Sequence, residues 1–105
     1  YVEVKNTTWP GPDNALAFPD AVTERGKKHL VELAAQVRKG KRAVLLFLAN
    51  RPHGDHVRAC HEKDPEYAKA LLRAHKAGVE IVAFRTRIDP PNVVLSDEVP
   101  VRLDY

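Results

Sequence analysis

The stretch that decides the fold is Arg42-Ala43-Val44-Leu45-Leu46-Phe47-Leu48-Ala49-Asn50, in which residues 43–49 form an unbroken apolar run. A strand with one face in water alternates apolar and polar residues, so a continuous run predicts a strand that is buried on both faces. Strands of this kind are typical of parallel sheets that helices cover. Helices are therefore expected on either side of residues 42–50.

The first helix is predicted over residues 22–39. Thr23 or Asp20 is suited to cap its first turn, and Gly40 follows its last turn, where a left-handed residue is common. Its apolar positions fall on one stripe, formed by Leu30, Leu33, Ala34 and Val37.

The second helix has sharper boundaries. Asp64-Pro65-Glu66 combines a capping residue with proline at the first helical position, and Gly78 follows the last turn. Between them, residues 65–77 direct four side chains inward, those of Tyr67, Ala70, Leu71 and Ala74.

Shorter strands complete the expected fold. Residues 1–9 alternate, which predicts that Val2 and Val4 face the core and that Glu3, Lys5 and Thr7 share the opposite face. A turn at residues 10–14, rich in proline with glycine and asparagine, leads to residues 15–18, the expected hairpin partner of the first strand.

The second half adds a polar loop at residues 51–63, a strand at 79–88, a short apolar piece at 93–95 and an edge strand at 99–103. The order is strand, strand, helix, strand, helix, strand. This order predicts an α/β fold in which two helices flank a mixed sheet, because parallel neighbours need crossover helices. Residues 1–105 are expected to form a single domain.

Composition excludes several classes of protein. The chain has 105 residues with 44% apolar and 30% charged residues, as in ordinary globular domains, and no apolar run approaches the roughly 18 residues of a membrane span. A single cysteine, Cys60, excludes an internal disulfide and suits a reducing compartment, so a cytoplasmic location is expected. The chain lacks methionine and opens directly on a strand pattern, which predicts a fragment of a longer polypeptide, truncated at its N-terminus.

Basic residues are concentrated in one part of the chain. Residues 24–42 hold seven Lys and Arg against two Glu, a local charge of +5, although the whole chain carries only +3. Clustered basic residues are typical of proteins that bind polyanions such as DNA. A solvated helix face has the same composition, and charge alone does not separate the two interpretations.

The strongest chemical pattern is Glu3-Val4-Lys5. Residues two apart on a strand leave the same face roughly 7 Å apart. A carboxylate there can hold Mg²⁺, which takes one or two carboxylates together with waters and phosphate oxygens, and a lysine can orient water or offset charge on phosphorus. Asp20, at the end of the expected hairpin, is a second metal carboxylate if the hairpin brings it near Glu3; otherwise it caps the first helix.

Other polar residues allow weaker predictions. Arg25 and His29 share a helix face, near Thr23 and Lys28, and such a set holds a phosphate or supports a carboxylate, unless it is only a solvated surface. In the loop, Arg51 is suited to a phosphate contact. No structural zinc is expected, because the spacing of His53, His56, Cys60 and His61 matches no closed Cys/His pattern.

Several motifs together resemble the sugar fermentation stimulation protein A (SfsA) family. They are residues 1–6, 18–26, 28–33, 43–47, 51–52, 64–67 and 78–80. The match corresponds to the C-terminal part of that family, whose N-terminal part resembles an OB-like domain. The resemblance implies a prokaryotic, nucleoid-associated DNA-binding protein that regulates sugar-metabolism genes.

The resemblance also implies a restriction-endonuclease-like PD-(D/E)xK core, with Glu3 and Lys5 at the strand signature and a further aspartate upstream of Tyr1. Two functions follow. In the first, the protein binds DNA through its basic residues, and the supporting set is Arg25, Lys27, Lys28, His29 and Arg51. In the alternative, it is a Mg²⁺-dependent nuclease with Glu3 and Lys5 as catalytic residues and with Glu3 and Asp20 as metal ligands.

Overall fold

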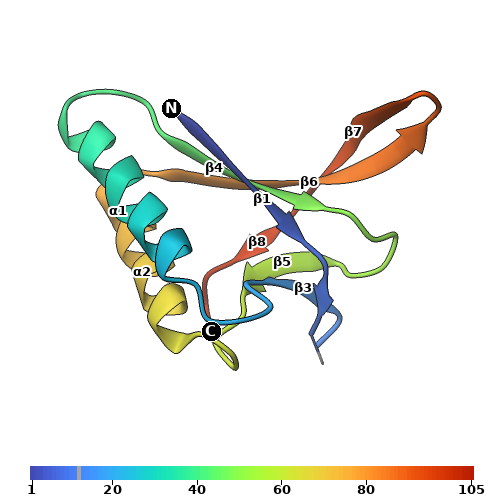
Figure 1. Cartoon of the computed structure of the whole chain (residues 1–105), viewed down its shortest axis with the longest axis horizontal. Helices are drawn as coiled ribbons and strands as arrows, with labels where there is room; N and C mark the ends of the chain where they lie inside the picture. Colours follow the sequence, from blue (N-terminus) through green and yellow to red (C-terminus); the bar gives the residue numbers. More distant parts are fainter. Residues whose placement is uncertain (12) are drawn as a thin grey trace.

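The computed structural model describes residues 1–11 and 13–105, and its first sheet is built around the apolar strand at the centre of the chain (Figure 1). The strand order in this sheet is β1-β4-β6-β7. Strand β4 pairs in parallel with β1 and β6, as the unbroken apolar run predicts, and β6 forms an antiparallel hairpin with β7. The predicted burial of this strand on both faces is wrong, because Val44, Leu46 and Leu48 are only half-buried. The strands are β1 (Val2–Thr7), β4 (Val44–Ala49), β6 (Glu80–Asp89) and β7 (Asn92–Val99).

The remaining strands form a second four-stranded sheet, in the order β2-β3-β5-β8. The prediction of one mixed sheet is therefore wrong, because the strands are divided between two. Residues 15–18 pair antiparallel with β2, whose Trp9 ends the predicted first strand, and do not pair with β1. Strand β3 also runs parallel to β5. The strands are β2 (Trp9–Pro10), β3 (Ala15–Phe18), β5 (His56–Ala59) and β8 (Val101–Arg102).

The structure also differs from the sequence prediction in the loop at residues 51–63 and in the tail. Residues 51–63 contain the buried strand β5, where a polar loop was predicted, and the tail forms β7 and β8 in place of isolated short pieces. The turn before β3 is present, with Asn14 at a left-handed φ of 59°. Pro12, which belongs to that predicted turn, lies outside the described residues.

The helices α1 (Glu24–Arg38) and α2 (Pro65–Ala77) agree with the sequence prediction. The hydroxyl of Thr23 caps α1 by accepting from the backbone N–H of Gly26, and the Asp64 carboxylate caps α2 by accepting from that of Tyr67. Gly78 ends α2 in the left-handed conformation with φ 108°. Figure 1 shows the two helices side by side at one end of the sheets.

The apolar stripes of both helices belong to one core cluster with buried residues of β3, β4 and β5. Ring centroids of Phe18 lie 5.8 Å from Phe47 and 5.3 Å from Tyr67, so an aromatic cluster joins β3, β4 and α2. Gly26 lets α1 approach this cluster, because a Cβ atom there would lie 3.1 Å from a ring carbon of Tyr67. Within the described chain, no helix is long and apolar enough to cross a membrane.

Strand β1 is turned opposite to the prediction. Val2 and Val4 are 64% and 48% exposed, while Glu3 and Lys5 are only partly exposed. The pairing explains this orientation: Glu3 and Lys5 lie beside Leu45 and Phe47 of β4, both buried on the side that the helices cover. The polar pair is thus directed toward α1.

Candidate functional site

Glu3, Lys5 and His29 meet between β1 and α1. The Nζ atom of Lys5 lies 3.3 Å from Oε1 of Glu3, which agrees with the prediction that the two share a face. Nδ1 of His29 lies 2.8 Å from the same Nζ and 3.1 Å from Oε1 of Glu3. Side-chain exposures of 33% for Glu3, 14% for Lys5 and 18% for His29 leave the carboxylate the most accessible of the three. We call these three residues the β1–α1 site.

The β1–α1 site opens onto a shallow depression of about 230 Å³. Its lining includes Tyr1, Glu3, His29, Glu32 and Gln36. Lys5 and His29 both make their printed contacts with Oε1 of Glu3, on the side of the carboxylate that faces α1.

The structure does not bring Asp20 into this group. Asp20 is exposed and lines a separate depression with Asn6, Trp9 and Phe18. It does not cap α1 either, since Thr23 has that role. Among residues 1–11 and 13–105, no group of three or more His, Cys, Asp or Glu side chains could hold a metal ion. The role of Asp20 as a metal ligand stays a prediction.

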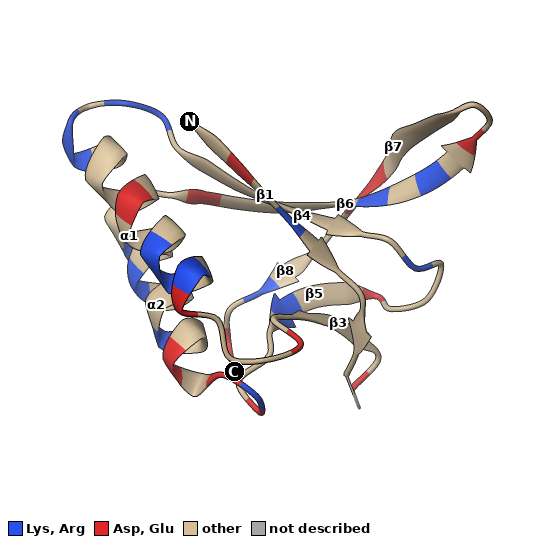
Figure 2. Ribbon diagram, viewed as in Figure 1, with Lys and Arg blue, Asp and Glu red and all other residues tan. Residues whose placement is uncertain are grey.

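The basic residues of the 24–42 segment separate into two groups (Figure 2). Arg25, Lys27 and Lys28 lie in the first turns of α1, and the others lie at or beyond its end, about 20 Å away at 1.5 Å per residue. Lys27 is bound to Glu24 at 2.7 Å, a hydrogen bond that raises the Lys27 pKa. Arg25 and Lys28 are exposed beside His29, so they are the members of the first group with charge available for a partner.

Arg51 is exposed at the end of β4, as a phosphate contact requires. The loop that carries it is held by Arg85, whose guanidinium donates to the carbonyl oxygens of Arg51, His53 and Gly54. The loop position is therefore fixed by backbone contacts, and the Arg51 side chain stays outside them.

Sequence reasoning missed a buried ion-pair network on β5. Arg58 is 5% exposed, and its guanidinium donates to both oxygens of Asp13 at 3.0 Å and to both oxygens of Glu62 at 2.7 Å. Hydrogen bonds from Arg58 lower the pKa of Asp13 to about 2 and that of Glu62 to about 2. His56, also buried, contacts the carboxylate of Asp55. The arginine in a strand-like His-Val-Arg-Ala run was the only signal in the sequence.

The remaining residues of the predicted loop that were compared with zinc motifs, Cys60, His61 and His53, have different surroundings. Cys60 is fully buried, and this burial raises the pKa of its thiol. The ring of His61 stacks on Tyr105 with centroids 5.6 Å apart, while His53 is exposed on the Arg51 loop.

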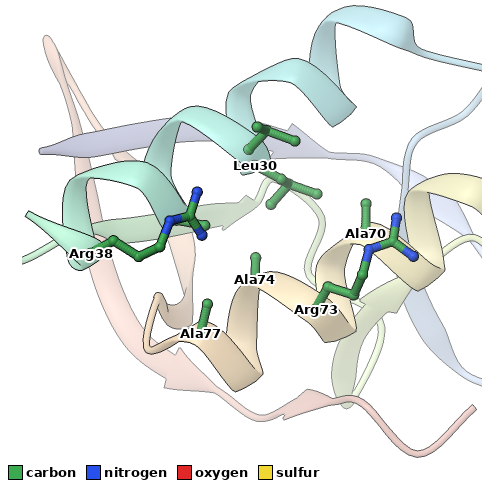
Figure 3. Close-up of a pocket in the computed structure, with 8 residues that line it drawn as sticks. Leu30, Arg38, Ala70, Arg73, Ala74 and Ala77 are labelled. Carbon is green, nitrogen blue, oxygen red and sulfur yellow. The ribbon is translucent and has the colours of Figure 1, made fainter.

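An apolar groove of about 200 Å³ runs between the two helices, away from the β1–α1 site (Figure 3). Leu30, Ala70 and Ala74 contribute to its floor. Arg38 and Arg73 line it from opposite helices, and their guanidinium groups lie over the gap in Figure 3.

The fold and the β1–α1 site define a mixed α/β protein with two mixed sheets and an acid–amine pair on its first strand. A family model described as "Sugar fermentation stimulation protein RE domain" matches residues 1–92. The chain therefore belongs to the sugar fermentation stimulation protein family.

Relatives and a solved structure agree with this assignment. A sugar fermentation stimulation protein homolog from Pseudomonas putida is 50% identical over 104 residues, which are 98% of this chain and 44% of the relative. The homolog from Shewanella woodyi is 47% identical over 103 residues, 98% of this chain and 43% of the relative. The structure of Pyrococcus furiosus SfsA in complex with Ca²⁺ matches with a TM-score of 0.85 and 29% identity, over 96% of this chain and 44% of that one. The chain thus spans less than half the length of these proteins.

Proposed function

We propose that the protein binds DNA, as the family resemblance implies, and that the β1–α1 site is the part of its DNA-binding surface that takes a divalent cation. The observation that carries the proposal is the contact of Lys5 with Glu3 at 3.3 Å, close to the exposed Arg25 and Lys28. A carboxylate supplies a ligand to a cation that bridges to a phosphate, and nearby cations neutralise the backbone. A cytoplasmic location and regulation of sugar-metabolism genes belong to the same proposal.

Glu3 suits one half of a metal site. At 33% exposure its side chain is the most accessible of the β1–α1 site, and hard cations such as Ca²⁺ and Mg²⁺ prefer carboxylate oxygens. The Ca²⁺ in the Pyrococcus furiosus SfsA complex supports a divalent cation in this family. One carboxylate is fewer ligands than a protein site usually supplies, so we assign a second to the rest of the longer family proteins, in line with a PD-(D/E)xK core and a preceding OB-like domain.

The DNA-binding proposal is tested with a duplex of random sequence in a salt series. Affinity should fall steeply as salt rises, with a slope of about 0.9 per neutralised phosphate. Lys28→Ala and Arg25→Ala should each lower the slope by about one contact. Lys76→Ala, which removes an exposed lysine at the end of α2, is the matched control and should leave the slope unchanged. An affinity that does not depend on salt would reject the proposal.

The second candidate is a Mg²⁺-dependent nuclease, favoured by the same Glu3–Lys5 contact. When bound, the metal would activate water and stabilise charge on the phosphate. Lys5 would orient the attacking water or offset the developing charge. Plasmid nicking with Mg²⁺ by the full natural protein, compared with Lys5→Ala, tests this role. Equal nicking by both proteins contradicts the assignment of Lys5, and the DNA-binding proposal stands without it.

A further inference from the structure

The histidine of the β1–α1 site has two charged neighbours at one nitrogen. Nδ1 of His29 is 2.8 Å from Nζ of Lys5 and 3.1 Å from Oε1 of Glu3. The neighbouring Leu30 and Leu33 are buried, and Gly26 keeps α1 close to Tyr67, so the helix that carries His29 has little freedom to move. The imidazole is therefore presented to β1 from a fixed support.

Whether Nδ1 of His29 donates or accepts decides which of its two contacts, with Lys5 or with Glu3, is a hydrogen bond. An ammonium group has three donors and no acceptor, so the 2.8 Å contact with Lys5 requires Nδ1 to accept. A nitrogen that accepts from Lys5 cannot also donate to Glu3, so the 3.1 Å contact of Nδ1 with Oε1 is not a hydrogen bond. Lys5 is thus held by two contacts, a hydrogen bond to Nδ1 of His29 and an ion pair with Oε1 of Glu3.

These two contacts of Lys5 respond differently to a cation. A divalent ion at Glu3 takes charge from the carboxylate and repels the ammonium, which weakens the Glu3–Lys5 pair. Nδ1 of His29 is not part of the carboxylate that takes the ion and belongs to another element, so it stays available to Lys5.

We propose that His29 is the positioning residue that keeps the Lys5 amine in the β1–α1 site when Glu3 binds a divalent cation. The inference rests on the proposed function, because it takes Glu3 as a cation ligand. It assigns a separate role to each residue: Glu3 binds the ion, Lys5 contacts the phosphate, and His29 holds Lys5 beside the ion. Without His29, the cation drives the flexible lysine out of the site.

The test follows Lys5 directly, by NMR of lysine side-chain ammonium groups in the full natural protein titrated with Ca²⁺. Wild type should keep an ordered Lys5 signal, with restricted exchange, after Ca²⁺ saturates Glu3. His29→Leu should lose that signal on Ca²⁺ addition. His29→Asn should keep it, because the amide oxygen of asparagine lies near the position of Nδ1 and also accepts. His75→Leu, which removes an exposed histidine from α2, should behave as wild type.

The second readout separates positioning from general damage. His29→Leu should bind Ca²⁺ as tightly as wild type or more tightly, because a repelling ammonium has left. Its DNA affinity in Ca²⁺ should fall about tenfold, the equivalent of one hydrogen bond to a charged group. A purely structural role would weaken Ca²⁺ and DNA binding together, and asparagine would not rescue.

The remaining outcomes separate the role of His29 from the proposal that the protein binds DNA. An ordered Lys5 signal in Ca²⁺-saturated His29→Leu overturns the role of His29, whether or not the protein binds DNA. If His29→Leu does not fold, failure of His29→Asn to retain the signal overturns it instead. If wild type gives the expected Lys5 signals but no DNA binding, the proposed function fails while the positioning of Lys5 by His29 stands.

Discussion

Replacing Arg58 with methionine removes the only charged donor that joins Asp13 to Glu62 within the described chain, while the apolar stem of the side chain is retained. Arg58 is 5% exposed and donates two hydrogen bonds to each carboxylate, at 2.7–3.0 Å. It links residues 45 positions apart, so it ties the turn before β3 to strand β5. The substitution should therefore loosen the second sheet.

The expected loss follows from the two interactions and from their exposure. A hydrogen bond to a charged group stabilises a protein by about 1.5–3 kcal/mol, so two paired carboxylates give about 3–6 kcal/mol before correction. Asp13 and Glu62 are 47% and 34% exposed, so water replaces much of what the arginine supplied. Halving the sum leaves a loss of about 1.5–3 kcal/mol in the free energy of unfolding.

Urea unfolding of wild type and Arg58→Met at several pH values measures this loss. The pKa of Asp13 and of Glu62 is lowered to about 2 in the folded protein, from ordinary values near 4. Their stabilisation is present above the unfolded pKa and disappears as pH falls toward 2, so the two proteins should converge in acid. Arg102→Met, an exposed arginine on β8, is the control. A difference below about 0.5 kcal/mol at pH 7, or one that is equal at pH 3 and pH 7, contradicts the reasoning.

Three further predictions concern packing and reactivity. Gly26→Ala should lower the free energy of unfolding by about 1–3 kcal/mol despite the better helix propensity of alanine, because its Cβ would lie 2.7 Å from Cγ2 of Thr23 and 3.1 Å from the Tyr67 ring. Gly40→Asn, at φ 81° with nothing within 4 Å, should change it by less than about 0.5 kcal/mol in the same urea assay. Asp64→Ala should cost about 2 kcal/mol, since Asp64 is buried and caps α2, and helicity measured by circular dichroism should melt earlier. Cys60 should react with a thiol reagent only as the protein unfolds, because it is buried and its pKa is raised; fast labelling of the native protein would contradict this.

The helices could be predicted from the sequence because their signals are local. Asp64 and Gly78 act through hydrogen bonds and backbone angles within one turn of α2, so neighbouring residues contain the necessary information. The same is true of Thr23 and α1. The apolar run of β4 predicted its parallel partners, although the burial on both faces from which that prediction was argued is absent on the side of Val44, Leu46 and Leu48.

Strand β5 was not predicted because its stabilising partners are remote in the sequence. His56 and Arg58 read as loop residues, and only the approach of Asp13, 45 residues from Arg58, makes a buried arginine acceptable. The division into two sheets was missed for the same reason, because β3 and β8 both pair with β5.

The candidate site was predictable in part. Strand periodicity alone places Glu3 and Lys5 on one face, and this part was confirmed. The face itself was wrong, because the valines of β1 resemble core residues although Val2 is 64% exposed. The contact of His29 with Lys5 depends on how α1 lies across β1, which helix periodicity does not specify.

The most direct test of the account measures DNA affinity with and without Ca²⁺ in the full natural protein and in Glu3→Gln, which keeps the size of the side chain but removes its charge. The account predicts that Ca²⁺ strengthens DNA binding by wild type and leaves the affinity of Glu3→Gln unchanged. If Ca²⁺ strengthens binding equally in both proteins, or in neither, Glu3 is not the cation ligand and the central claim is wrong.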